Sequence, residues 1–173
     1  RYVILLISIL LLIPAGIGYM NTKVNYDLLY YLPDGIDTMT GQDIMMDEFD
    51  SGAFSIVMVD KMDVKDVTKL IDKMKKVDHV SKVLWYDSFE KAGVPKSMLP
   101  DDVYKAFNKG TSTIMMVIFD DTSSGEGTMD AITQLRNLTQ KQCYISGISA
   151  IVTDTKVLVE QEMFIYVCIA ALV

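Results

Sequence analysis

The residues able to do chemistry are few and scattered. His79 is the single histidine of the chain, and a zinc site would need further ligands at suitable spacings, which the sequence does not place near it. Asp120, Asp121 and Glu126 supply oxygen atoms within one stretch, but they lack the alternating ligands of a calcium-binding loop. We expect His79 to be a solvent-facing turn residue and the three acids to belong to a solvated loop, so no metal site is predicted.

The sequence also shows no set of residues with the types and spacing of a catalytic site. Cys143 and Cys168 are the two cysteines, and they lie in segments too different in character to form a disulfide framework. Asp101 and Asp102 are adjacent and suit the start of a helix better than acid–base chemistry. No nucleophile motif or glycine-rich phosphate loop is present in the sequence. We predict a protein that is not an enzyme and takes no cofactor.

The distribution of charge divides the chain into three parts. Of its 173 residues, 50% are hydrophobic and 23% are charged, and the net charge is -7. Every Lys and Arg except Arg1, and every Asp and Glu except Glu162, lies in residues 21–161. This pattern rules out a plain cytosolic globular protein. The acidic middle part argues against nucleic acid as a partner, because it would repel phosphates.

Residues 2–20 predict a membrane-spanning helix. They carry no charge, and as a helix they would be about 28 Å long, close to the thickness of the hydrocarbon core of a bilayer. Pro14 would kink this helix, which membrane helices tolerate. A signal peptide is the competing interpretation, although the run is longer than a typical h-region and lacks an A-x-A site. Arg1 favours a cytoplasmic near flank, which places the middle part outside the cytoplasm.

Residues 163–173 are also uncharged and apolar. As a helix they would reach about 16 Å, half a bilayer, so we expect them to begin a second span that continues in a longer polypeptide. The predicted organisation is a membrane helix at 1–20, a connecting segment with a short helix at 21–53, a folded ectodomain at 54–147 with an insertion at 88–111, and a helix at 148–173 that leads into the second span. The expected location is the cell membrane, with the ectodomain on the extracytoplasmic side.

Hydrophobic periodicity predicts an α+β ectodomain. Short apolar runs indicate strands at 54–59, 80–86, 113–119 and 142–146. Apolar residues three and four apart indicate amphipathic helices at 64–77 and 129–138, and the insertion would hold a short helix at 101–108 between Asp101 and Gly110. In the second strand, one face would carry Val80, Leu84 and Tyr86. The order β-α-β, insertion, β-α-β predicts a ferredoxin-like split β-α-β sandwich, with one face of its sheet under two helices.

The connecting segment predicts one helix. Thr40 is expected to begin it, with Asp43 as an acid of the capping-box type, and Gly52 is expected to end it. The residues that would face inward are Ile44, Met45 and Phe49.

Two passages resemble the MMPL-type branch of the RND superfamily of transporters. In the first, Leu32 and Pro33 lead into a small-residue stretch and a helix, and Phe49 and Gly52 follow before the first strand. The glycine comes later here than in the family pattern. In the second, Gly147 and the small residues after it are followed by Asp154 on the way into the second span. The resemblance covers the whole chain, and the order of span, ectodomain and span is more specific than either motif.

The resemblance implies a proton-driven exporter of hydrophobic or lipid-like molecules, in which the ectodomain is half of the porter region and shifts as a rigid body. It implies membrane lipids, the remaining spans and a second ectodomain of the same transporter as partners. The acids of the proton relay would lie on later membrane helices.

Methionine is abundant, with 12 residues in the chain. Met115 and Met116 are adjacent on a predicted strand, so their side chains point to opposite faces and one of them must leave the helix-covered face. We expect that residue to face a partner subdomain or an apolar cargo path, because methionine suits adaptable apolar surfaces. Core packing is the alternative.

A second class of function stays open. Bacterial sensor kinases and chemoreceptors also place a ligand-binding ectodomain of about this size between two spans. Further spans soon after residue 173 would indicate a transporter, whereas one span followed by a helical linker would indicate a receptor.

Overall fold

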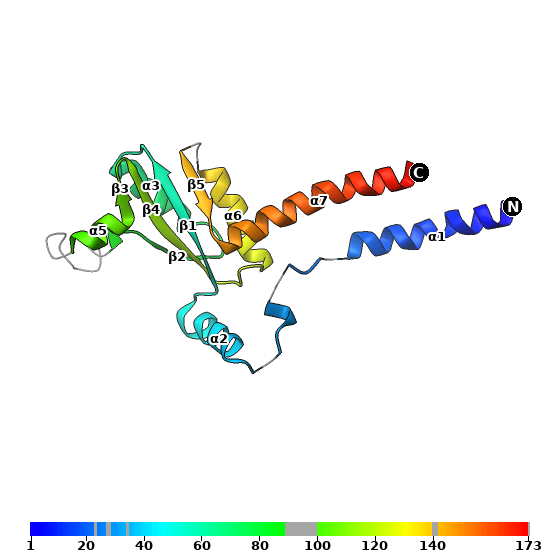
Figure 1. Ribbon diagram of the computed structural model, residues 1–173, viewed down its shortest axis with the longest axis horizontal. Coiled ribbons are helices and arrows are strands. Elements are labelled where there is room, and N and C mark those ends of the chain that lie inside the picture. Colours follow the sequence, from blue (N-terminus) through cyan, green and yellow to red (C-terminus); the bar gives the residue numbers. More distant parts are fainter. Residues whose placement is uncertain (23, 27–28, 34, 89–99, 140–141, 173) are drawn as a thin grey trace.

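The computed structural model describes residues 1–22, 24–26, 29–33, 35–88, 100–139 and 142–172. In these residues a five-stranded antiparallel sheet is combined with six α-helices and one short 3-10 helix (Figure 1). The predicted α+β class is therefore confirmed.

The sheet joins strands that are not neighbours in the sequence. Its strands are β1 (Ala53–Asp60), β2 (Val80–Leu84), β3 (Asn108–Lys109), β4 (Ser112–Phe119) and β5 (Cys143–Ser146). The order is β2-β4-β1-β5, with β3 paired to β4, and every pairing is antiparallel. Consequently α3 (Val64–Met74) connects β1 to β2 across β4, and α6 (Glu126–Leu138) connects β4 to β5 across β1.

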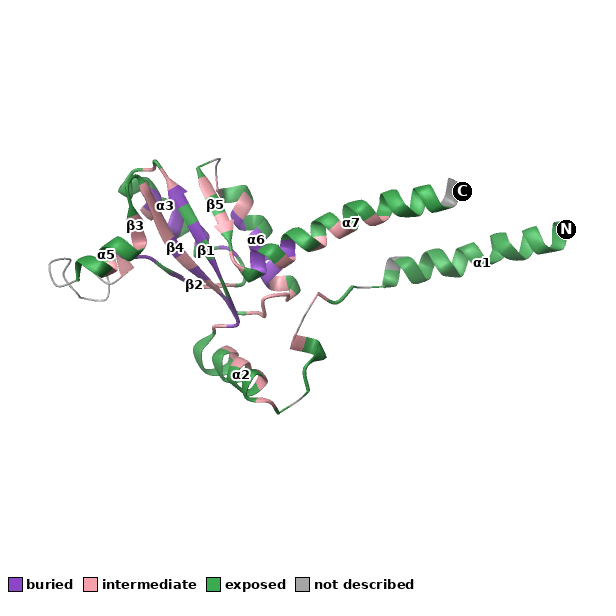
Figure 2. Cartoon of the chain, in the orientation of Figure 1, coloured by how far each residue is buried: buried purple, intermediate pink, exposed green. Residues whose placement is uncertain are grey.

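One face of the sheet carries the hydrophobic core. Buried and exposed residues alternate along β1, as Figure 2 shows, and Val57 and Val59 lie on the buried side. The apolar stripes of α3 and α6 pack onto the same face. Val64 and Leu138, at the ends of these two helices, are 54% and 38% exposed. The core includes the large buried side chains of Phe119, Met74, Met115, Ile132 and Leu135.

The prediction for the faces of β2 is wrong. Val83 and Trp85 are buried, at 3% and 2% exposure, whereas Leu84 is 42% exposed. The pairing of β2 with β4 shifts register directly after Val80. An extra residue in a strand reverses the side to which the following side chains point, so the residues after the shift exchange faces. Tyr86 is buried after the end of the strand.

The connecting segment contains a 3-10 turn over Leu29–Tyr31 and α2 over Asp37–Phe49. The helix begins before Thr40, and Asp50 caps its end in the left-handed conformation, with φ of 49°, so Gly52 is not its last residue.

The predicted inward face of α2 is also wrong. Ile44, Met45 and Phe49 are 50%, 48% and 60% exposed. Figure 1 shows that α2 lies beyond one end of the sheet and does not cover either face. Its apolar side chains therefore have no core to enter.

The described part of the insertion forms α5 (Asp101–Phe107) and then β3. Pro100 takes the N-cap position expected for Asp101. Gly110, with φ of 61°, lies in the turn between β3 and β4 and does not end the helix. Residues 89–99 of the predicted insertion lie outside the described residues.

Two long helices project from the same side of the domain (Figure 1). α1 (Tyr2–Asn21) runs toward the domain, and α7 (Ile148–Leu172) runs away from it. In the part of the chain that the structure describes, one helix is long and apolar enough to cross a membrane, over Tyr2–Tyr19, and none of that window is buried. A signal sequence would pass the same test. α7 is one continuous helix that extends from the domain into the apolar residues after Met163.

Candidate functional surface

The face of the sheet opposite the core is apolar, and no helix of the described residues covers it. On β1 this face carries Phe54, Ile56 and Met58, which are 52%, 38% and 38% exposed. Their partners on β4 are Ile118, Met116 and Ile114, all half-buried. The register therefore places six large apolar side chains side by side in the centre of the sheet.

The apolar character continues to one residue on each edge strand, next to the polar Lys82 and Ser146, which pair with Ile118 and Ile56. Leu84 of β2 pairs with Met116 and is 42% exposed, and Tyr144 of β5 pairs with Met58 and is 58% exposed. Soluble monomers rarely expose a large contiguous apolar patch, and such patches commonly mark contact with a protein, a membrane or a ligand. We call these residues the open sheet face: Phe54, Ile56, Met58, Leu84, Ile114, Met116, Ile118 and Tyr144.

The adjacent methionines of β4 separate onto the two faces. Met115 is 1% exposed and belongs to the core, whereas Met116 lies on the open sheet face beside Ile56 and Leu84. Met116 is the residue that leaves the helix-covered face.

Two glycines of the family-like passages occupy backbone positions that a side chain would not fit. Gly147 has a φ of 124°, and a Cβ atom there would lie 3.3 Å from the Cα of Ser55. At Gly52 a Cβ atom would collide with the backbone carbonyl of Asp121, and the Gly52 N–H donates to the carbonyl of Phe119 at 2.8 Å. Both glycines thus allow close approach of backbone segments at the ends of β1 and β5.

The other residues of the first passage do not join the open sheet face. Leu32 is 39% exposed and Pro33 is exposed. Phe49 is 60% exposed, and its carbonyl accepts a hydrogen bond from the Lys82 ammonium at 2.6 Å, which ties the end of α2 to β2. The structure does not bring these three residues into one site.

Asp154 makes an ion pair that the sequence analysis missed. The Arg136 guanidinium on α6 donates to both Asp154 carboxylate oxygens on α7, at 2.6 and 2.9 Å. A bidentate pair of this kind fixes orientation as well as distance. It holds the start of α7 against α6. The signal in the sequence was that Arg136 is the sole arginine apart from Arg1.

The remaining candidates for chemistry have structural roles. His79, with φ of 65°, lies 3.0 Å from the Asp120 carboxylate through its Nδ1 atom. The Asp121 carboxylate accepts from the backbone N–H of Thr122 at 2.7 Å and of Gly127 at 3.1 Å, so it caps the start of α6. No group of three or more His, Cys, Asp or Glu residues that could hold a metal ion occurs among the described residues. Cys143 is half-buried and Cys168 is exposed, and the described residues contain no disulfide.

A hollow of about 410 Å³ lies where α1 ends beside α7, and its lining includes Tyr19, Tyr26, Lys156 and Glu160. Burial, reinforced by the negative charge of Glu160, raises the pKa of the Tyr26 hydroxyl above its usual value. The phenol therefore stays neutral and remains a hydrogen-bond donor at physiological pH.

No protein-family model matches the chain, and no curated protein matches it either. The features of the molecule that bear on its function are the open sheet face and the two helices that leave the domain together.

Proposed function

We propose that this chain is part of a proton-driven membrane exporter of hydrophobic or lipid-like molecules, of the MMPL-type branch of the RND superfamily, with its ectodomain as half of the porter region. The observation that carries the proposal is the open sheet face, an apolar surface on a domain from which two helices leave on one side. Such a surface suits a protein that handles apolar molecules or packs on another subdomain.

The strand order supports the finer description of the fold as ferredoxin-like. The order β2-β4-β1-β5 results from two β-α-β units that each skip one strand, and this is the arrangement of a split β-α-β sandwich. The opposite chain directions of α1 and α7 support two membrane spans, with α1 entering and α7 returning. The ectodomain would then lie on the extracytoplasmic side.

The open sheet face would contact the second ectodomain of the same transporter, cargo, or both. Met116 lies near its centre, where a flexible and polarizable side chain can adapt to acyl chains or to a packed partner. The Arg136–Asp154 pair would transmit a rigid-body shift of the domain to α7, because the two helices are held in one orientation.

The test is export of a fluorescent phospholipid analogue from proteoliposomes that hold the natural polypeptide containing this chain, driven by a pH gradient. We expect Met116→Glu to reduce export strongly, because it places a charge on the apolar surface. Lys65→Glu, on the exposed side of α3, is the matched control and should export normally. Absence of export by the unaltered protein at any gradient would overturn the proposal.

A ligand-binding ectodomain of a two-span sensor or chemoreceptor is the second candidate. The observation that favours it is the continuity of α7, which connects the domain directly to its apolar end over 25 residues. A sensor would bind a water-soluble ligand with a thermal shift and would export nothing in the same proteoliposomes.

A further inference from the structure

α2 presents an acidic surface without a partner. The helix carries Asp37, Asp43, Asp47 and Glu48 and has neither lysine nor arginine. None of its residues is buried. Viewed along the helix axis, Ile44 lies between Asp47 and Glu48. Met45 and Phe49 lie to one side of these three residues. α2 is therefore an exposed helix with carboxylates around apolar anchors, and we call this surface the acidic α2 face.

A groove of the opposite charge runs between α3 and α6. It consists of two adjoining hollows of about 420 and 440 Å³, which share Lys73 and Leu138. Its apolar lining is Met62, Leu70, Val77 and Leu138, and its lysines are Lys61, Lys69, Lys73 and Lys76. We call it the basic groove.

The charges of the basic groove are only partly compensated. Lys69 pairs with Asp66 at 2.8 Å, Lys61 lies 4.0 Å from the carboxylate of Asp60, and Asp63 also lines the groove. Lys73 and Lys76 make no ion pair with any residue in the described part of the chain. Four lysines against three aspartates leave the groove with a small positive excess, at Lys73 and Lys76, in a chain whose net charge is -7. A partner with carboxylates and a few apolar side chains would match both its charge and its lining.

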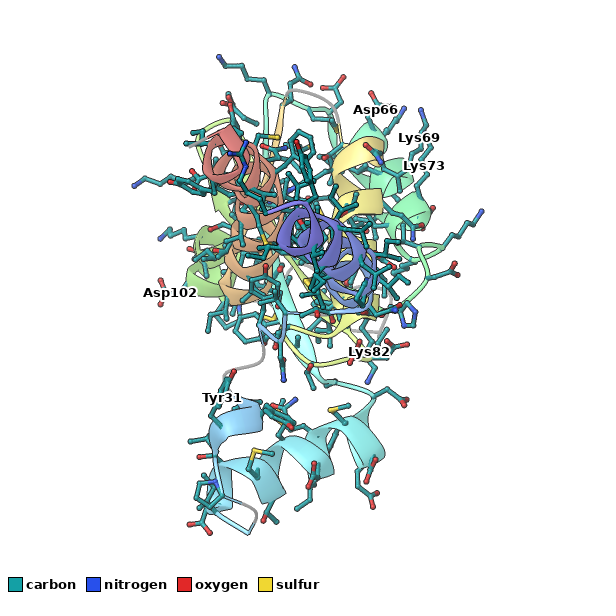
Figure 3. All side chains as sticks on the ribbon, turned by 90° about the vertical axis from the view of Figure 1, so that its right-hand side faces the viewer. Tyr31, Asp66, Lys69, Lys73, Lys82 and Asp102 are labelled. Atoms are coloured by element: carbon teal, nitrogen blue, oxygen red, sulfur yellow. The ribbon has the colours of Figure 1, made fainter. Side chains whose placement is uncertain are left out.

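The α2 of the same copy lies far from the Lys61 end of this groove, while the Val77 end leads into β2, whose Val80 pairs with Phe119 opposite Ala53. α2 is joined by residues 50–52 to the start of β1, whereas Lys61 of the groove follows directly after the end of β1. Eight residues of strand separate these points by about 26 Å. Figure 3 shows the same separation: Tyr31, near α2, lies on the opposite side of the domain from Asp66, Lys69 and Lys73.

We infer that the acidic α2 face of one copy docks in the basic groove of a neighbouring copy. The two surfaces are different patches on opposite sides of the domain, so the contact is head-to-tail and can close into a ring. Docking of a helix in a groove is a common way for proteins to recognise each other. The helices α2, α3 and α6 all belong to the part of the molecule from which α1 and α7 project, so two copies with parallel long helices bring them to similar levels (Figure 1). The inference does not depend on the proposed transport function.

The test uses two charge reversals of the full chain in detergent, with mass measured by analytical ultracentrifugation. Lys73→Glu with Lys76→Glu makes the groove acidic, and Asp43→Lys with Glu48→Lys makes α2 basic. We expect the unaltered chain to associate, with weaker association at high salt. Each reversed protein alone should associate at least about tenfold more weakly than the unaltered chain, because like charges then face each other.

The mixture of the two reversed proteins distinguishes this interface from any other. In the mixture, the basic α2 meets the acidic groove and the acidic α2 meets the basic groove, so association should return. Lys65→Glu with Lys75→Glu is the matched control, because both lysines are exposed on α3 outside the groove, and it should associate like the unaltered chain. An unaltered chain that stays monomeric, reversed proteins that associate normally, or a mixture that stays apart would each overturn the inference.

Discussion

The two faces of the sheet are made of similar residues and have opposite surroundings. On β1, Val57 and Val59 are at most 1% exposed, while Ile56 and Met58 between and beside them are each 38% exposed. A strand with one wet face normally alternates apolar and polar residues, whereas a strand covered on both faces reads as a continuous apolar run. β1 and β4 have the second kind of sequence, but helices of this chain cover one face. The difference teaches that the open sheet face has the sequence of a covered face, although no helix of the described residues covers it.

The largest expected effect comes from placing a charge on each face in turn. Met115→Glu should destabilise the domain by about 4 kcal/mol or more, because an unpaired carboxylate would be buried in the core. Met116→Glu should cost about 1 kcal/mol or less, because its side chain reaches solvent. Urea unfolding followed by the fluorescence of the single, buried Trp85 measures both. Equal losses would mean that both faces are covered in solution.

Removing one ring from each face is a gentler version of the same comparison. Phe119→Ala should cost about 3–5 kcal/mol, since its fully buried ring would leave a cavity. Phe54→Ala, at a residue that is 52% exposed, is the matched variant and should cost about 1 kcal/mol. The difference between the two unfolding free energies is the measurement. A large loss at Phe54 that appears only at high protein concentration would reveal a partner on the open sheet face.

Gly147, between β5 and α7, tests how closely the backbone approaches Ser55 of β1 at the end of the core. Gly147→Ala should cost about 1–3 kcal/mol, because alanine is strained at a φ of 124° and its Cβ would press on Ser55. Thermal unfolding measures the loss. Gly110→Ala, at a positive φ of 61° with open space around it, is the milder reference, because it lacks the crowding and alanine is less strained there than at 124°. A cost at Gly147 no greater than at Gly110 would contradict the close approach.

The ion pair between α6 and α7 should matter less for stability than for alignment. Arg136→Ala should cost about 1 kcal/mol, because both groups are partly exposed to solvent. Hydrogen exchange at the start of α7 should speed up, and Arg136→Lys should restore only part of the protection, since lysine cannot bind both carboxylate oxygens. Unchanged exchange in Arg136→Ala would show that packing alone holds α7.

The smallest expected effect is a pH dependence of the stability, which comes from Asp60 at the end of β1 and from neither face of the sheet. Hydrogen bonds from the Thr111 and Ser112 hydroxyls hold the pKa of Asp60, at the end of β1, below its usual value. The stability that this carboxylate contributes is present above the usual pKa of an aspartate and is lost as the pH falls through the lowered one. Melting temperatures of Asp60→Asn and the unaltered chain should converge in acid. A difference that persists at the lowest pH would contradict this assignment.

Much of the fold follows from local patterns that the sequence displays. The apolar runs predict β1, β4 and β5 to within one residue at their ends, and the three-and-four spacing predicts α3 and α6. These predictions succeed because side-chain periodicity is a property of each element alone.

The errors lie where one element depends on another. Leu84 of β2 lies on the side opposite to the predicted one, because a register shift against β4 leaves no mark in five residues of sequence. The apolar residues of α2 were placed inward because a helical pattern does not say whether a core is within reach. Arg136 and Asp154 are 18 residues apart, so only the packing of α6 against α7 makes them partners.

The sequence by itself determined the α+β class and the apolar end helix, because composition and period are local quantities. It also determined that Met115 and Met116 point to opposite faces of a strand. Only the tertiary structure decided which methionine is buried, which sheet face stays uncovered, and that an acidic helix and a basic groove lie on opposite sides of one domain. Those outcomes depend on strand order and register, which bring distant residues together and cannot be read from neighbours along the chain.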